Sequence, residues 1–170
     1  MNYKRVIIIG KGGSGKDYLR KQLVQEGFRY CVSHTSRPIR NGEINGEDYY
    51  FVNENYFYTV PFYEKVIFNK WHYGTSIGEF NASNLFIMTP SGLSKMPQND
   101  REKSLVIYVD INENTRKIRL TERGDIDDVE RRLRTDRVDF ENFSDFDHII
   151  TNPNFGVDEL NLIKNKWLIY

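Results

Sequence analysis

The chain has 170 residues, enough for one domain with a full hydrophobic core. Its 24 lysines and arginines balance 24 aspartates and glutamates, so no overall field favours nucleic acid or a membrane surface as a partner. Cys31 is the only cysteine, which excludes an intrachain disulfide, and with neither a signal-peptide pattern nor an apolar run of membrane-spanning length we expect a cytoplasmic protein.

Strand patterns alternate with helix patterns along the chain. Apolar runs predict strands at Arg5–Gly10, Phe28–Val32, Leu85–Met88, Leu105–Val109 and His148–Thr151. Helical periodicity predicts helices at Lys16–Glu26, Asn112–Arg123, Val129–Phe143 and Val157–Leu168. This alternation is typical of an α/β fold with a parallel five-stranded sheet flanked by helices.

The region 33–83 departs from this rhythm. It is rich in aromatic residues, Asn and Gly, with short strand-like pieces at Tyr49–Val52 and Tyr63–Phe68. Turn signals at Asn41-Gly42 and Asn45-Gly46 fit hairpin-like connections. We interpret the region as a small mixed α+β insertion that overhangs the carboxyl edge of the core sheet, where ligands bind in such folds.

A glycine-rich stretch follows the first apolar run: Gly10-Lys11-Gly12-Gly13-Ser14-Gly15-Lys16-Asp17. Its spacing, G-x-x-x-x-G-K between a strand and a helix, is that of a phosphate-binding loop. Glycines let successive backbone N–H groups point into one concavity that holds phosphate oxygens, and the helix N-terminus adds partial positive charge. Lys16 can then span the β- and γ-phosphates. The stretch predicts binding of a nucleoside triphosphate.

Asp17 stands where a Ser or Thr hydroxyl normally coordinates Mg²⁺. A carboxylate is also a hard oxygen ligand, so it can hold Mg²⁺ directly or through a water. It also adds negative charge beside an anionic triphosphate. Asp17 is therefore our candidate metal ligand, with Mg²⁺ bound together with ATP.

A second anion site is indicated by Arg37 and Arg40, which are separated by the rigid Pro38. Two arginines at this spacing can form a fork around one phosphate. Taken alone, these residues fit a solvated polar turn equally well.

The arginine pair belongs to a longer set of motifs in which the sequence resembles the guanylate kinase family. The matching motifs are Ser33, Thr35-Ser36-Arg37-Pro38-Ile39-Arg40, Gly42-Glu43, Gly46, Asp48-Tyr49, Phe51-Val52, Glu64 and Tyr73-Gly74-Thr75-Ser76. With the phosphate loop and the segment from Arg123-Gly124 to Asn152, the resemblance covers nearly the whole chain in order. It implies a P-loop NTPase fold and a single domain over 1–170. The core would be 1–32, 84–118 and 145–170, with a nucleoside-monophosphate-binding insertion at 33–83 and a helical lid at about 119–144.

The resemblance also implies an activity: reversible transfer of the γ-phosphoryl group of MgATP to GMP or dGMP. It assigns the acceptor's phosphate to Arg37, Arg40, Tyr49 and Tyr73. It assigns guanine to Ser33, Glu64 and Thr75, with Thr89 standing where the family usually has an acidic residue that helps to read the base. A carboxylate such as Glu64 can accept from both N1–H and the exocyclic N2–H₂ of guanine, whereas adenine has no such adjacent donor pair.

The ATP side is assigned in the same way. Arg119 and Arg123 are four apart on one predicted helix and share a face. By resemblance, Arg119, Arg123 and Arg132 reach the ATP phosphates and act with Lys16 in catalysis. The predicted ATP-binding residues are Gly10, Gly12, Gly13, Ser14, Gly15, Lys16, Asp17 and Asn152, the last near the adenine.

Two other functions remain open at this point. A related family that phosphorylates ribose 1,5-bisphosphate has a similar loop ending in Asp, although Glu64 and the Arg37, Arg40 and Tyr49 set suit a nucleotide better. Non-catalytic guanylate kinase-like modules bind other partners, but their phosphate loops are typically degraded, and this one keeps Gly15 and Lys16. We expect a monomer or homodimer that binds ATP and GMP or dGMP, with no nucleic-acid or membrane partner.

Overall fold

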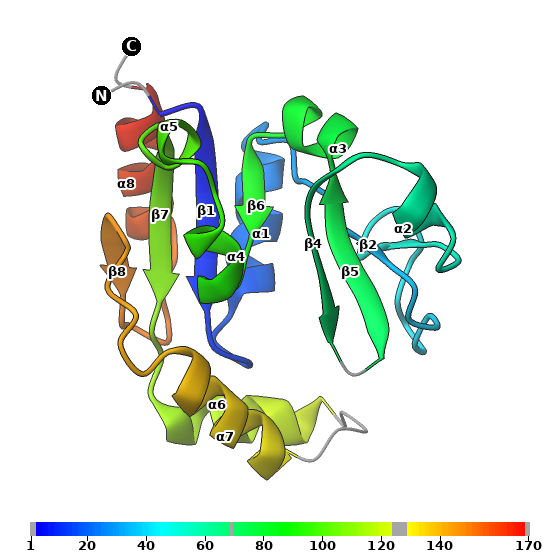
Figure 1. Ribbon diagram of the computed structural model, residues 1–170. Helices are drawn as coiled ribbons and strands as arrows, with labels where there is room; N and C mark the ends of the chain where they lie inside the picture. Colours follow the sequence, from blue (N-terminus) through cyan, green and yellow to red (C-terminus); the bar gives the residue numbers. More distant parts are fainter. Residues whose placement is uncertain (1–2, 69, 124–128, 169–170) are drawn as a thin grey trace. The chain divides into compact units, whose positions relative to one another are not determined.

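The computed structural model describes residues 3–68, 70–123 and 129–168 (Figure 1). The chain divides into two compact units. The larger unit consists of Met1–Phe28 and Leu85–Tyr170, and the smaller unit is Arg29–Asn84. Positions 124–128 of the predicted lid lie outside the described residues.

The larger unit is built on a parallel sheet. Its strands are β1 (Arg5–Gly10), β6 (Leu85–Ile87), β7 (Ser104–Val109) and β8 (His148–Ile150), in the order β6-β1-β7-β8. Every residue of β7 is buried, and in β1 only Arg5 is partly exposed. Such continuous apolar strands are typical of a parallel sheet covered on both faces. The predicted α/β class with a parallel sheet is confirmed.

Helices surround this sheet. They are α1 (Lys16–Gln25), α4 (Pro90–Ser94), α5 (Gln98–Arg101), α6 (Glu113–Glu122), α7 (Val129–Asp139) and α8 (Val157–Leu168). Helix α1 packs on β1 and β6 and against α8, and it buries Leu19 and Leu23. Helices α6 and α7 pack on each other, and Figure 1 shows them beyond the end of the sheet toward which β7 points. Among the helices described, none is long and apolar enough to cross a membrane.

The prediction of a fifth strand in this sheet is wrong for the part of the chain that is described, where the sheet has four strands. The expected strand, Phe28–Val32, has a single bridged residue, Tyr30. The N–H group of Arg29 donates to the side-chain oxygen of Asn84 at 2.7 Å, and the N–H group of Asn84 donates to the Arg29 carbonyl at 3.0 Å. Because a side chain takes the place of a strand carbonyl, these contacts do not continue into a ladder.

The smaller unit has a mixed sheet. Its elements are β2 (His34–Thr35), β3 (Tyr50–Phe51), α2 (Tyr56–Thr59), β4 (Phe62–Phe68), β5 (Trp71–Ser76) and α3 (Ile77–Ala82), and the strand order is β3-β2-β5-β4. β5 is antiparallel to both β2 and β4, but β2 and β3 pair in parallel. The hairpin-like connections predicted from the turn signals at Asn41-Gly42 and Asn45-Gly46 are therefore wrong, because the strands on either side of these turns are parallel. Gly42 and Gly46 do turn the chain with positive φ, but two successive turns restore its direction.

Aromatic side chains fill the interior of the smaller unit. Phe57 is fully buried and stacks on Phe62, with ring centroids 4.8 Å apart. His34 is also buried and stacks on Tyr56 at 5.1 Å. This packing supports β2 and its partner β5, the strand that carries Tyr73 and Thr75, two of the residues that the resemblance assigns to the nucleotide acceptor.

Candidate active site

The phosphate loop joins the end of β1 to the start of α1 and needs glycine for two reasons. Gly13 and Gly15 have φ of 75° and 100°, in the left-handed region that favours glycine. Space is also short, because a Cβ on Gly10 would lie 2.7 Å from the Val109 carbonyl oxygen. A Cβ on Gly13 would lie 2.8 Å from the Arg116 carbonyl oxygen. The loop is thus held close to both β7 and α6.

Lys16 lies at the first position of α1, and its Nζ donates to the Lys11 carbonyl at 3.0 Å. Desolvation lowers the pKa of Lys16 to about 8, and nearby Arg132 acts in the same direction. The carboxylates of Asp17 and Asp136 oppose this shift. The ammonium group therefore remains mostly charged at neutral pH but incompletely compensated, which suits it to receive an anion.

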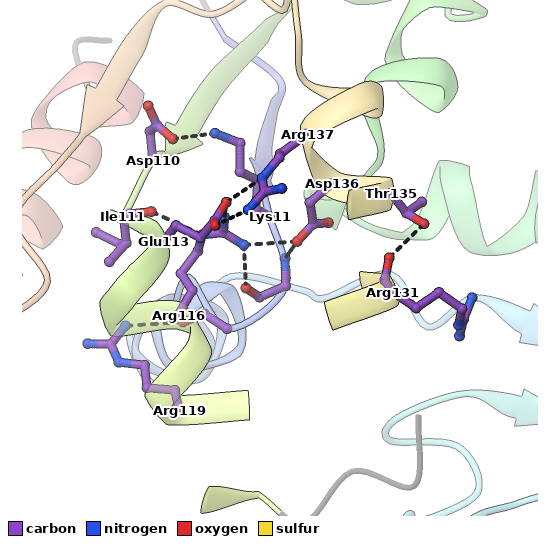
Figure 2. Close-up of polar contacts among 12 residues, drawn as sticks. Lys11, Asp110, Ile111, Glu113, Arg116, Arg119, Arg131, Thr135, Asp136 and Arg137 are labelled. Carbon is purple, nitrogen blue, oxygen red and sulfur yellow. Dashed lines mark hydrogen bonds and ion pairs between the residues drawn. The ribbon is translucent and has the colours of Figure 1, made fainter. Parts of the chain in front are cut away.

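Arg116 is a site residue that the sequence reasoning missed. It is 2% exposed, and its guanidinium group donates to the carbonyls of Ile111 and Gly12, each at 3.1 Å (Figure 2). It also donates to Asp136 Oδ2 at 2.9 Å, and the same oxygen accepts from the N–H group of Gly12 at 2.9 Å. The only hint in the sequence is that Arg116 lies one helical turn before Leu120, on the apolar side of the predicted helix.

Arg119 lies at the phosphate loop, and the contacts described for it are with backbone carbonyls. Nη1 donates to the carbonyls of Gly13 and Ser14 at 3.3 Å each, and Nη2 donates to the carbonyl of Pro153 at 2.8 Å. Arg119 thus ties the loop to the turn that follows β8. In that turn Asn152 accepts a bond from the N–H group of Asn154 at 2.9 Å.

The other two predicted lid cations differ in surroundings. Arg132, on α7, is partly buried and close enough to Lys16 to lower the pKa of its ammonium group. Arg123, directly after α6, is exposed. The structure therefore brings Arg132 and Arg119 to the phosphate loop, and it leaves the side chain of Arg123 in solvent.

Asp17 is placed in the first turn of α1, where its side chain is 63% exposed and 3.6 Å from Nε of Arg20. Among the residues described, no three His, Cys, Asp or Glu side chains come together as a metal-binding group. One exposed carboxylate fits a Mg²⁺ ion that takes most of its ligands from phosphate oxygens and water.

In the smaller unit, the three residues assigned to guanine are hydrogen-bonded in a row. Thr75 Oγ1 donates to Glu64 Oε1 at 3.1 Å, and Ser33 Oγ lies 3.4 Å from Thr75 Oγ1. Glu64 and Thr75 are paired residues on β4 and β5. These strands come close because Gly74 has no side chain: a Cβ there would lie 2.6 Å from the Glu64 carbonyl oxygen.

The residues assigned to the acceptor's phosphate also gather in the smaller unit. Arg37 makes a two-pronged ion pair with Glu43, at 2.7 and 3.0 Å, and its guanidinium lies over the Tyr49 ring at 5.6 Å. The rings of Tyr49 and Tyr73 lie 6.1 Å apart, edge to face. Glu43 also accepts from the backbone N–H of Arg40 at 2.7 Å. Glu43 therefore organises the segment between the two arginines, a role not predicted from the sequence.

Thr89 belongs to the larger unit, unlike Ser33, Glu64 and Thr75. Its Oγ1 accepts from the Gly92 N–H at 3.0 Å and caps the short helix α4. The hydroxyl that was predicted to contact the base thus has a capping role in this structure.

Comparisons with known proteins point to one family. The family model described as guanylate kinase matches residues 2–162. A guanylate kinase of Legionella pneumophila (strain Paris) is 29% identical over 164 residues, covering 88% of this chain and 78% of that protein. One from Lactobacillus acidophilus is 28% identical over 175 residues, covering 93% and 86%.

A solved structure agrees at the level of the fold. The crystal structure of guanylate kinase from Anaplasma phagocytophilum matches with a TM-score of 0.68 and 18% sequence identity, covering 99% of this chain and 88% of that one. The family model spans nearly the whole sequence, from residue 2 to residue 162. The chain belongs to the guanylate kinase family.

Proposed function

We propose that this protein is an ATP-dependent nucleoside monophosphate kinase that phosphorylates GMP or dGMP, giving GDP or dGDP. The observation that carries the proposal is the row of Ser33, Thr75 and Glu64 in a chain of this family that keeps its phosphate loop. A carboxylate whose neighbours hold it in place can accept from the two adjacent donors of guanine.

The acceptor's phosphate is assigned to Arg37, Arg40, Tyr49 and Tyr73. Arginine binds phosphate through two parallel hydrogen bonds, and a tyrosine hydroxyl adds a further donor. Glu43 already pairs with Arg37, so the incoming phosphate has to share or replace that partner. We assign this binding role to the insertion 33–83, and the triphosphate role to the core segments 1–32, 84–118 and 145–170.

The chemistry needs little from the protein beyond charge and alignment. An oxygen of the monophosphate attacks the γ-phosphorus of ATP, the bond to the β–γ bridging oxygen breaks, and ADP leaves with that electron pair. A phosphate monoester has its second pKa near 6, so its oxygen is already anionic at neutral pH and no general base is required. The obstacle is the repulsion between two polyanions held in line.

We assign the reduction of that repulsion to cations of the larger unit. Lys16 is assigned to the β- and γ-phosphates, and Arg132 is near enough to lower the pKa of its ammonium group. Arg119 supports the loop through its carbonyl contacts, and Arg123 would approach only if a lid of about 119–144 closes over the triphosphate. Closure would also exclude water, which otherwise competes with the acceptor.

ATP would enter as its Mg²⁺ complex. We assign the ion to the carboxylate of Asp17 in the first turn of α1, which would hold it directly or through a water. When bound, the ion neutralises charge on the β- and γ-phosphates.

The test is ADP formation from MgATP across an acceptor panel of GMP, dGMP, AMP, UMP, CMP, dTMP, IMP and ribose 1,5-bisphosphate. A strong preference for GMP or dGMP supports the proposal. Activity on the bisphosphate with none on GMP identifies a sugar-phosphate kinase instead. Saturable ATP binding with no transfer to any acceptor identifies a non-catalytic binding module. Light scattering of the same sample tests whether the protein is a monomer or a homodimer.

A further inference from the structure

A buried ion pair holds the phosphate loop at one residue, Gly12. Asp136 Oδ2 accepts from the Gly12 N–H, and Arg116 donates both to that carboxylate oxygen and to the Gly12 carbonyl. The three bonds form a closed ring that includes the peptide groups on both sides of Gly12. Figure 2 shows Arg116 and Asp136 facing each other from two different helices.

The pair lies in surroundings where such an interaction is costly unless every bond is made. Arg116 is 2% exposed, and the Asp136 side chain is 18% exposed. Removing two charges from water is only repaid if geometry and further hydrogen bonds are good. Here Arg116 has a third acceptor, the Ile111 carbonyl, and Asp136 has its second donor in the loop itself. The pair is therefore bound to the loop, not merely adjacent to it.

The same contact sets the position of helix α7. Arg132 precedes Asp136 by four residues, so the two side chains lie on one face of the helix. Anchoring Asp136 at Gly12 directs this face toward the loop and brings Arg132 near Lys16. Two more ion pairs join the helices, Lys117 with Glu130 and Arg137 with Glu113, but they are exposed and the bonds described for them do not reach the loop.

We propose that Arg116 and Asp136 are positioning residues, which fix the peptide groups flanking Gly12 and align Arg132 of helix α7 with Lys16 at the phosphate loop. The inference rests on the proposed function for its kinetic consequence, but its structural part concerns the loop alone. Misplacing a charge-stabilising group by about 1 Å costs on the order of 100-fold in rate, so a loosened loop should lower kcat more than it weakens GMP binding.

The experiment compares the double variant Arg116→Met/Asp136→Leu with wild type. Replacing a buried ion pair by apolar residues of similar size is often neutral for stability, so we expect melting within about 5 °C of wild type. We expect kcat for GMP phosphorylation to fall roughly 10- to 100-fold with KM for GMP unchanged. Hydrogen exchange of the peptide that covers 10–15 should become faster, and ATP should bind more weakly. A double variant with wild-type kcat and wild-type loop exchange overturns the proposal.

Two further variants serve as controls for the double variant. Asp136→Asn keeps an oxygen for the Gly12 N–H but loses the charge, so it should show a smaller loss in kcat and faster loop exchange. If the double variant does not fold, wild-type behaviour of Asp136→Asn overturns the proposal instead. Lys117→Met removes an exposed pair between the same two helices and should match wild type in every measurement. An equal fall in kcat in this control shows that helix pairing in general, not the bond to Gly12, is responsible, and it also overturns the proposal.

Failure of the proposed function is distinguishable from failure of this inference. Exchange of the loop amides and ATP binding are measured without any acceptor. If wild-type protein binds ATP but phosphorylates no nucleotide, the proposed function fails, while the comparison of loop exchange still decides the role of Arg116 and Asp136.

Discussion

Replacing Lys16 by methionine keeps the length of the side chain and removes its charge. Lys16 Nζ has a carbonyl acceptor, that of Lys11, and burial lowers its pKa to about 8. At pH 7 about nine-tenths of the molecules still carry the charge, so the ammonium is available to a triphosphate. Loss of one such group costs about 3 kcal/mol in the transition state, or roughly two orders of magnitude in kcat/KM for ATP.

Lys16→Met should lower activity but should not lower the stability of the fold. The folded protein holds Lys16 with a pKa below its ordinary value of 10.5, so between pH 8 and 10.5 the unfolded chain binds more protons than the folded one. Wild type should therefore gain stability as pH rises through this window, and the variant should lack that gain. At neutral pH, where the wild type bears the full cost of the buried charge, the methionine variant should melt at the same temperature or higher.

The assay is coupled ADP release with GMP as acceptor, together with thermal melting from pH 7 to 10. In wild type, kcat/KM for ATP should decline as pH rises through about 8, because the free enzyme loses the Lys16 proton. The control is Lys21→Met, which removes an exposed charge from the same helix. Undiminished activity of the Lys16 variant would refute the assigned role. A large drop in its melting temperature would refute the argument from desolvation.

Three further predictions concern other parts of the protein. Gly13→Ala adds a Cβ 2.8 Å from the Arg116 carbonyl oxygen at a φ of 75°, so it should lower the free energy of unfolding, measured by urea titration, by about 1–3 kcal/mol. The control Gly78→Ala has open space around its Cβ and should not lower it; equal effects of the two variants would contradict the steric argument. Glu64→Gln should lower kcat/KM for GMP about 10- to 100-fold with ATP binding unchanged in calorimetry, and an unaltered GMP preference would remove Glu64 from base reading. Burial lowers the pKa of His34, so as pH falls below about 6.5 the unfolded chain takes up a proton before the folded chain does. Wild type should therefore lose stability relative to His34→Phe as pH falls. A stability difference between the two proteins that stays the same from pH 7.5 to 5 would contradict the argument.

The local features of the larger unit could be predicted because they depend on neighbours in the chain. Strand β1 has the predicted bounds, one residue beyond the apolar run 6–9 at each end, and helix α8 also has its predicted bounds. The glycines of the phosphate loop are required by positive φ angles and by the short distance to neighbouring backbone atoms. Both requirements fix glycine at particular positions, so the sequence shows a recognisable motif. The assignment of Ser33, Thr75 and Glu64 to one site was predicted from motifs of the family, not from their spacing in the sequence.

Pairing between distant segments was decided by the tertiary structure. The run Phe28–Val32 is as apolar as a strand, but the Arg29 N–H donates to the side-chain oxygen of Asn84, where a ladder would need a backbone carbonyl. Strands β2 and β3 became parallel because two turns, not one, lie between them. Sequence periodicity describes which residues share a face, and it carries no information on the direction of a partner strand.

Burial of charge was the other feature that only the tertiary structure decided. Arg116 and Arg119 look alike in the sequence, as two cations on one helix, and neither their type nor their spacing tells which one is buried. The difference arises because Asp136, 20 residues further on, reaches Gly12 from a second helix and gives Arg116 a partner inside the protein. A charge can remain inside a protein only where distant groups complete its bonds, and those groups come together only in the folded chain.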